Sequence, residues 1–227
     1  MSEASEFSFG RFVEDRKAGV FGREDGPRYA YAADVAMMRS FQYLRPVELA
    51  VSAVVRTNCA LLKGQLLGHA VKVGPAQFPS IYRIAERCAG KLGVAVPQVY
   101  VANSPVMNAY TFGTDTESFI VLHSALVDNF DDKELEFVIG HETGHVQNKH
   151  VIYNTALLLL RQMAEAILGP LVMPAVLALS AWYRRAEITC DRAGLLCSQD
   201  LDAGARSFVK LAVGSTRLAG ELNIDAY

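Results

Sequence analysis

The chain has 227 residues, and its 22 Lys and Arg residues nearly balance its 24 Asp and Glu residues, for a formal net charge of −2. This balance argues against a protein that binds a nucleic-acid backbone through a broad basic surface. Hydrophobic residues make up 51% of the chain, which excludes a disordered protein and indicates a well-packed globular one. We therefore expect no nucleic-acid partner.

The cysteines and the N-terminus indicate the compartment. Four cysteines without a CxxC pair do not form a dense disulfide framework, so we expect free thiols in a reducing environment. Residues 1–6 have neither the basic region nor the apolar region of a secretory signal. The sequence thus predicts a cytoplasmic protein, with peripheral membrane contact as an open alternative.

The chain divides into an arm and one domain. Residues 1–28 mix charge, glycine and aromatic residues without a steady period, and we interpret them as an extended N-terminal arm. Residues 29–227 are predicted to form the domain. Its parts are a helical region at 29–94, a small sheet at 95–123, helices at 124–200 and a C-terminal helical segment at 201–227.

Within the first half of the domain, apolar spacing predicts two helices and three strands. Residues 47–67 show the spacing of an amphipathic helix, and residues 79–92 form another, with proline at its start and Gly93 just after it. Short β-branched and aromatic runs separated by turn residues predict strands at 98–101, 110–112 and 118–122.

The next predicted helix carries the chemistry. Asp131, Asp132 and Glu134 place acidic groups near the positive end of its dipole. It contains His141-Glu142-Thr143-Gly144-His145, a match to HExxH. Residues four apart project side by side from a helix, so the two imidazoles can share one zinc ion, and the glutamate can hold a water on the metal. The alternative is a helix with two hydrogen-bonded histidines and no metal.

A catalytic zinc needs a third protein ligand and one open position. His150 lies about 180° round the helix from His141, so it faces away unless the helix ends first. We expect His150 to be either solvated or behind the ligands. Glu187 and Asp191 are four apart and share a face, so one can bind metal while the other accepts the free N–H of a ligating histidine. The alternative is a solvated helix face beside arginines.

The order of these motifs resembles the HtpX-like and CAAX prenyl-protease family of gluzincin zinc metallopeptidases. The resemblance extends over roughly residues 75–200 and includes Pro97-Gln98-Val99-Tyr100-Val101 and Asn108-Ala109-Tyr110. It implies an α+β fold, mostly helical and zincin-like, with a small β-sheet and an HExxH active-site helix. It also implies one zinc ion per chain.

The same resemblance implies residue roles. The implied metal ligands are His141, His145 and Glu187, the implied general base is Glu142, and Asp191 would be the partner of His141 behind the metal. Asn108 and Ala109 match the family's strand that contacts the substrate backbone. Residues 118–122 would be the edge strand beside which an extended peptide lies.

The predicted function is a zinc-dependent endopeptidase that hydrolyses peptide bonds in flexible or unfolded protein segments. Glu142 would take the proton of the zinc-activated water. The alternative is a latent or inactive metallopeptidase-fold protein that binds or assembles with partners, its cleft blocked by the N-terminal arm or by an apolar elbow.

The uncharged run at residues 166–183 raises the question of a membrane span. A single crossing would put His145 and Glu187 on opposite sides of the bilayer, and two crossings need about 40 apolar residues, more than the partly charged intervening segment supplies. We therefore predict no transmembrane span. Because Pro170 and Pro174 break helices, we expect two short helices joined by an apolar elbow at 168–174. The run 166–183 would pack in the core or form a peripheral membrane or homo-oligomer contact.

Three assignments stay open from the sequence. Related enzymes usually supply a donor to the oxyanion from the part of the chain after the third ligand, where Arg206, Arg217 and Tyr227 are the candidates and the sequence does not choose among them. His123 is expected at the rim of the site. Cys190 is expected to pack in the core, with a metal-poised thiol as the alternative.

Overall fold

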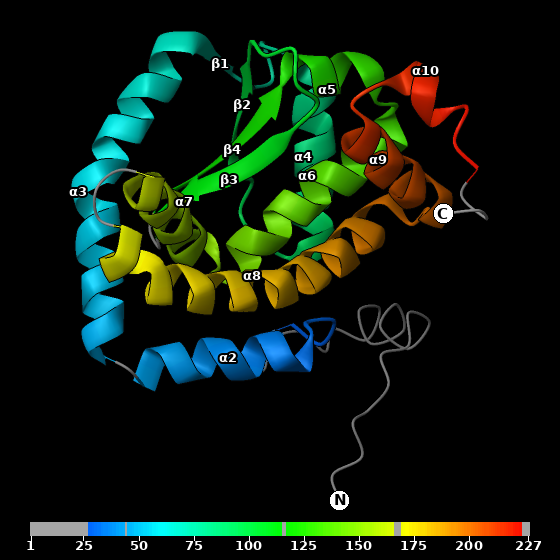
Figure 1. The fold of residues 1–227 in the computed structure, drawn as a ribbon. Helices are drawn as coiled ribbons and strands as arrows, with labels where there is room; N and C mark the ends of the chain where they lie inside the picture. Colours follow the sequence, from blue (N-terminus) through cyan, green and yellow to red (C-terminus); the bar gives the residue numbers. More distant parts are fainter. Residues whose placement is uncertain (1–26, 44, 115–116, 166–168, 224–227) are drawn as a thin grey trace, which may run out of the picture.

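The computed structural model describes residues 27–43, 45–114, 117–165 and 169–223. It is an α+β structure in which helices surround one small sheet, as expected (Figure 1). The predicted arm falls almost entirely on residues 1–26, which lie outside the described residues.

The elements follow in chain order. The helices are α2 (Ala32–Tyr43), α3 (Arg45–His69), α4 (Pro79–Leu92), α5 (Ser124–Asn129), α6 (Asp132–Gln147), α7 (Val151–Glu165), α8 (Gly169–Ser198), α9 (Leu201–Val213) and α10 (Thr216–Ala219). The strands are β1 (Ala70–Lys72), β2 (Gln98–Ala102), β3 (Ala109–Gly113) and β4 (Ser118–His123). The predictions of two early helices and three strands are confirmed. Strand β1 was not anticipated, because three residues are too few to show a period.

The strand order is β1-β2-β4-β3, so β4 lies inside the sheet and β3 is an edge strand. The prediction that residues 118–122 form the edge is therefore wrong. Strand β4 runs parallel to β2 and antiparallel to β3. Its residues 119–122 are fully buried, and such a continuous apolar run is typical of a central strand covered on both faces.

Helix α6 begins with a capping box. The Asp131 side chain accepts hydrogen bonds from the backbone of Lys133 and Glu134, and the Glu134 side chain accepts one from the Asp131 backbone N–H. The buried Glu134 carboxylate also pairs with Lys210 Nζ at 2.6 Å and with Arg206 Nε at 3.1 Å. These contacts tie α9 to the start of the helix that carries HExxH.

Helix α8 is a single helix of 30 residues, so the predicted elbow at 168–174 and the two short helices are not observed as such. Residues 166–168, between α7 and α8 in the sequence, lie outside the described residues. Pro170 is in the first turn of α8, where its missing N–H has no intrahelical partner to lose. Pro174 is in an exposed turn, where water can bond the carbonyl that the proline leaves without a donor. No helix in the described ranges is long and apolar enough to cross a membrane.

Helices α6 and α8 approach closely because glycines line their contact. A Cβ atom on Gly140 would lie 2.5 Å from the Cβ of Cys197, and one on Gly144 would lie 2.8 Å from the Cβ of Ala193. On α8, a Cβ atom on Gly194 would lie 2.7 Å from the carbonyl oxygen of Phe137. The two backbones can therefore come close enough for side chains of α8 to reach those of α6.

Replacing Gly194 with alanine tests this packing. The added methyl group meets backbone rather than a flexible side chain, so we expect the free energy of unfolding to fall by about 1–3 kcal/mol. The matched control is Gly90→Ala on α4, where no heavy atom lies within 4 Å of the added Cβ and the protein should gain up to about 1 kcal/mol. Chemical denaturation of both variants measures the difference, and equal midpoints would contradict the close contact.

Candidate active site

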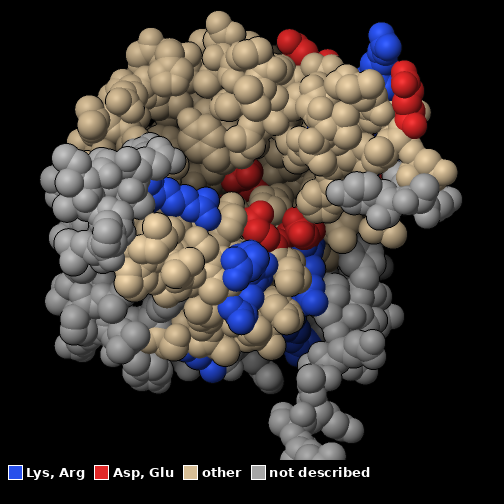
Figure 2. Space-filling view, in the orientation of Figure 1, with Lys and Arg blue, Asp and Glu red and all other residues tan. Residues whose placement is uncertain are grey.

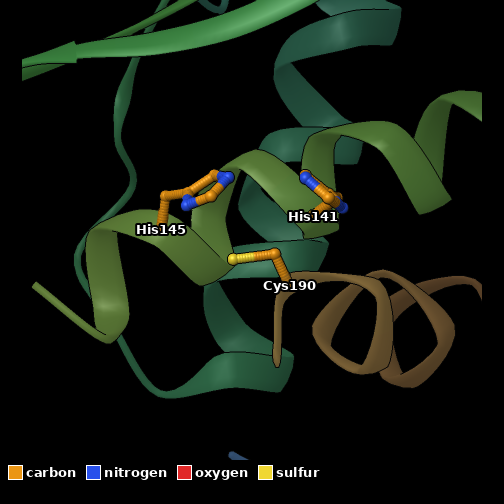
Figure 3. Close-up of side chains that lie close together, drawn as sticks. All are labelled: His141, His145 and Cys190. Atoms are coloured by element: carbon orange, nitrogen blue, oxygen red, sulfur yellow. The ribbon is translucent and has the colours of Figure 1, made fainter. Parts of the chain in front are cut away.

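The two histidines of HExxH lie on one side of α6, in successive turns. Their ring centroids are 5.1 Å apart, and both rings project from the face that meets α8 (Figure 3). His145 is buried, whereas part of the His141 side chain reaches solvent. The expected side-by-side arrangement of the two imidazoles is therefore present.

Glu187 on α8 completes a three-donor arrangement. Its Oε2 lies 3.5 Å from His141 Nε2, and its Oε1 lies 3.4 Å from His145 Nε2. Donor atoms around a tetrahedral zinc, each about 2.0–2.1 Å from the metal, are roughly 3.3 Å apart, close to these separations. Glu187 Oε1 is buried and has no hydrogen-bond partner among the described residues. A divalent cation between the three side chains would satisfy this atom, so the donor set fits a metal ion.

The protonation of these groups suits a metal site. Burial alone would raise the pKa of Glu187, but the neighbouring His145 and His141 outweigh it and lower the pKa to about 2. For His141 burial would lower the pKa, but the hydrogen bond to Asp191 and the charges of Glu187 and Glu142 raise it to about 9. The Glu187 carboxylate is thus ionised at neutral pH, and a protonated His141 supplies the positive charge beside it.

Asp191 contacts the His141 ring on the nitrogen away from Glu187. Its Oδ1 lies 3.0 Å from His141 Nδ1, the ring nitrogen that faces away from Glu187. A carboxylate there accepts the Nδ1–H, which fixes the tautomer and leaves the Nε2 lone pair for a metal. The structure thus places Asp191 where the sequence predicted it.

Cys190 offers a rival third donor. Its sulfur lies within 4.8 Å of donor atoms of both histidines, and it reaches toward them from α8 (Figure 3). The thiol is fully buried, and burial first, then the charge of Glu187, raises its pKa well above the usual range. Its sulfur also lies 3.7 Å from His150 Nδ1. Both Glu187 and Cys190 therefore lie within reach of a metal ion between the two imidazoles, the first as an ionised carboxylate and the second as a protonated thiol.

Glu142 is held by the edge strand. Thr111 of β3 donates a hydrogen bond from Oγ1 to Glu142 Oε2 at 2.6 Å. The Glu142 side chain is buried but lines the cleft described below, so its second oxygen, Oε1, can meet a water there. The sequence did not single out Thr111, because one threonine in a short strand carries no distinguishing pattern.

A cleft of about 550 Å³ opens in front of these residues. Figure 2 shows acidic atoms inside a hollow at the centre of this face and basic atoms along its lower rim. Asn108 and Ala109 line the cleft, as expected of residues that contact a substrate backbone. The other lining residues include Leu62 and Leu66 of α3, Leu157 and Arg161 of α7, and Tyr183 of α8.

The outer edge of β3 faces this cleft. The Gly113 N–H donates to Thr155 Oγ1 at 2.9 Å, which shows that this residue turns its backbone outward from the sheet. Outward-facing residues alternate along an antiparallel strand, so Ala109 and Thr111 also present backbone groups on this side. The His123 N–H donates to the Asn108 carbonyl, so in this register residues 110 and 112 pair with β4 while the N–H groups of Ala109 and Thr111 point away from it. This edge is therefore unpaired with another strand at Ala109 and Thr111, while α7 covers it at Gly113.

Tyr183 lies in the cleft one helical turn before Glu187. Its ring is nearly parallel to that of His145, at an interplanar angle of 10° and a centroid separation of 6.2 Å. Burial, followed by the charges of Glu187 and Glu142, raises its pKa, so its hydroxyl stays protonated and can donate. The spacing of four residues before Glu187 was the signal that could have identified it.

The oxyanion candidates named from the sequence lie elsewhere. Arg206 is bound to Asp131 and Glu134 at the start of α6, and the exposed Arg217 pairs with Glu221. Neither of these two candidates lines the cleft, because their guanidinium groups pair with carboxylates elsewhere. Tyr227 lies outside the described residues. His123 ends β4, and its Nδ1 lies 3.0 Å from the Val106 carbonyl oxygen.

His150 is not solvated. Helix α6 ends at Gln147, so the chain turns before His150 and brings its ring behind His145, with the two Nδ1 atoms 3.2 Å apart. The side chain is 1% exposed. Of the two readings of His150, the position behind the ligands is confirmed. All four cysteines are free and buried, as expected.

The sequence is similar to known peptidases. The model of peptidase family M48 matches residues 75–223. The chain is 34% identical to the plastoglobule-localized metallopeptidase 48 of Arabidopsis thaliana over 171 residues. This aligned region covers 71% of this chain and 48% of that protein. It is 26% identical to the protease HtpX homolog of Nostoc punctiforme over 164 residues. That alignment covers 70% of this chain and 53% of the relative.

A third relative, the protease HtpX homolog of Tropheryma whipplei, is 32% identical over 91 residues, covering 40% of this chain and 31% of that protein. The chain thus spans about half the length, or less, of these relatives. The family match includes the HExxH helix, Glu187 and Asp191. The chain belongs to peptidase family M48, a family of metallopeptidases with a zincin-like fold.

Proposed function

We propose that this protein is a zinc-dependent endopeptidase that cleaves flexible or unfolded protein segments. The observation that carries the proposal is the convergence of His141 Nε2 and His145 Nε2 on the Glu187 carboxylate, one oxygen of which is buried without a hydrogen-bond partner. Two histidines and a glutamate form a known ligand set of catalytic zinc, in which the fourth position is left for water or substrate. Here that position would face the cleft.

The proposed chemistry divides between the metal and Glu142. Zinc held by His141, His145 and Glu187 would lower the pKa of a water in the fourth position toward 7. Glu142 Oε1 would take a proton from the attacking water and return it to the leaving amine, while Thr111 holds Oε2 in place. A fixed carboxylate needs little reorganisation for either transfer.

Tyr183 is proposed as the donor to the oxyanion. Its phenol lies beside Glu187 and lines the same cleft as Glu142. Because its pKa is raised, it keeps its proton at working pH and can donate a hydrogen bond to the carbonyl oxygen as negative charge develops there.

The substrate is proposed to bind as an added strand on β3. The outward backbone groups of Ala109 and Thr111 can pair with an extended peptide, a mode that gives affinity with little dependence on side chains. A folded segment does not expose such an edge, so flexible or unfolded regions are the favoured substrates. Asn108 and Ala109 would contact the peptide backbone, as the family resemblance implies.

Location and further contacts remain predictions. The cytoplasmic location is our proposal for this chain, while the Arabidopsis thaliana relative is named as a chloroplast protein of plastoglobules. Met173 and Leu177 on α8 are exposed and belong to the run 166–183, which we proposed for a peripheral membrane or homo-oligomer contact. The alternative of a latent binding protein would retain the metal site and lack peptide cleavage.

Replacing Glu142 with glutamine tests the assignment of the general base. We expect zinc binding to be retained and hydrolysis of an unfolded protein such as casein to fall by about 10²–10⁴-fold, because the amide cannot take the proton. Glu86→Gln, the same change at an exposed carboxylate on α4, should leave the rate unchanged. Equal cleavage by the Glu142 variant and the wild-type protein would refute the role. Zinc binding without any cleavage by the wild-type protein would favour the latent alternative.

Replacing Tyr183 with phenylalanine tests the oxyanion donor. The variant keeps the ring that stacks near His145 but loses the hydroxyl, so kcat should fall by about 10²–10³-fold, with KM and zinc affinity nearly unchanged. Tyr82→Phe on α4, outside the cleft, serves as the control. A change confined to KM would contradict donation in the transition state.

The raised pKa of His141 predicts how zinc binding depends on pH. A metal that binds Nε2 must displace a proton below about pH 9, so zinc affinity should rise by about tenfold per pH unit from pH 7 and level off near pH 9. Calorimetry at pH 7 in buffers of different ionisation enthalpy should show the release of about one proton. The same proton stabilises the metal-free fold below about pH 6.5, and this contribution is lost as the pH rises through about 9. An affinity that does not change between pH 7 and 9 would contradict the prediction.

A further inference from the structure

We infer that Asp34 and His150 hold the His145 ring so that its Nε2 lone pair points to the metal position. Helix α2, which carries Asp34 and lies outside the family match, would then contribute to the active site. This inference rests on the proposed zinc site at His141, His145 and Glu187. It concerns side chains that do not touch the metal position and act through His145.

Asp34 lies on α2 and is fully enclosed. Its side chain is 1% exposed and receives three hydrogen-bond contacts. Trp182 Nε1 donates to Oδ1 at 2.9 Å, Thr189 Oγ1 donates to Oδ2 at 2.7 Å, and His150 Nε2 lies 3.1 Å from Oδ2. Two of these partners belong to α8, along which α2 runs in Figure 1.

The carboxylate of Asp34 sets the direction of the next hydrogen bond. A carboxylate can only accept, so the hydrogen of the His150 ring sits on Nε2 and its Nδ1 carries a lone pair. That lone pair faces His145 Nδ1 at 3.2 Å and lies 3.7 Å from the sulfur of Cys190, which is a weaker donor, so we assign a hydrogen to His145 Nδ1, which donates. The lone pair of His145 is left on Nε2, the atom that lies 3.4 Å from Glu187 Oε1.

Asn154 supports the same tautomer once its amide is turned. Its Nδ2 lies 3.1 Å from His145 Nδ1, and its buried Oδ1 has no hydrogen-bond partner among the described residues. The two ends of an amide are distinguished only by their hydrogen bonds, and exchanging them lets Oδ1 accept the His145 Nδ1–H. The exchange agrees with the direction that Asp34 imposes, and it moves Nδ2 to the position where Oδ1 has no partner.

The buried negative charge of Asp34 favours a cation at the Nε2 atom of His145, to which Asp34 is linked through His150. Within the described part of the protein no lysine or arginine pairs with Asp34; the basic side chain beside it is His150, whose buried ring is neutral because its Nδ1 carries a lone pair. A carboxylate behind a ligating histidine raises the basicity of the ligand and fixes its orientation. Here one more imidazole extends that arrangement, and a dication on His145 would balance the buried negative charge. The family match begins at residue 75, so α2 supplies this carboxylate from outside it.

Zinc dissociation constants of the full chain, measured by competition with a chromogenic chelator, test the inference. Asp34→Asn replaces an acceptor of three hydrogen bonds with an amide, whose NH2 group cannot accept, and so disturbs His150. His150→Leu removes the contact to His145 Nδ1. Each variant should weaken zinc binding by about 10–100-fold. His150→Gln can still donate to Asp34 and accept from His145, so it should stay within about threefold of the wild-type value. Thr189→Val removes another donor to the same carboxylate and is the matched control, also within about threefold.

A second readout separates positioning from packing. With cobalt in place of zinc, Asp34→Asn and His150→Leu should shift the visible absorption of the saturated protein, whereas Thr189→Val should not. Wild-type affinity in both Asp34→Asn and His150→Leu would overturn the inference, as would an equal loss in Thr189→Val. If Asp34→Asn does not fold, the pair His150→Leu and His150→Gln decides, and equal affinities in that pair overturn the inference. A wild-type protein that binds no zinc would instead refute the proposed metal site.

Discussion

The close contact between α6 and α8 is the constraint on which the candidate site depends. Glycines at 140, 144 and 194 remove the side chains that would separate the two helices. Without that approach the carboxylates of α8 would not reach the imidazoles of α6, since the atoms involved are only 3.0–3.5 Å apart. The buried core made by α4, the sheet, α6 and α8 holds this geometry from the opposite side. Packing and chemistry are therefore specified by the same pair of helices.

The metal-free site is stabilised by its own charges. An ionised Glu187 lies between two histidines, and the pKa of His141 is raised far enough for its ring to be protonated at neutral pH. This proton compensates the nearby carboxylates, and in the proposed zinc site a metal ion would replace it. A site organised in this way does not need to be rebuilt when the metal binds, because the donor atoms already lie at nearly the required spacing.

The sequence predicted the local parts of the site better than its long-range parts. HExxH and the Glu187–Asp191 spacing are helical patterns, and helix geometry alone places their side chains, so those predictions agree with the structure. The order of strands depends on pairing between distant segments, and β4 was therefore mistaken for an edge strand. The same holds for Thr111 on Glu142 and for Asp34 behind His150, contacts between residues 31 and 116 positions apart that no spacing rule reveals. The α8 prolines were misjudged because one lies in the first turn and the other in an exposed turn.

X-ray absorption at the zinc edge of the metal-loaded protein tests the central claim most directly, because nitrogen or oxygen and sulfur ligands differ clearly in distance. The account predicts a shell of nitrogen and oxygen atoms only, at about 2.0–2.2 Å, with the multiple-scattering pattern of two imidazoles. It also predicts that Glu187→Gln alters this shell and that Cys190→Ala does not. A sulfur atom at about 2.3 Å that disappears in Cys190→Ala would contradict the account, because the third ligand would then be the buried thiol rather than the carboxylate.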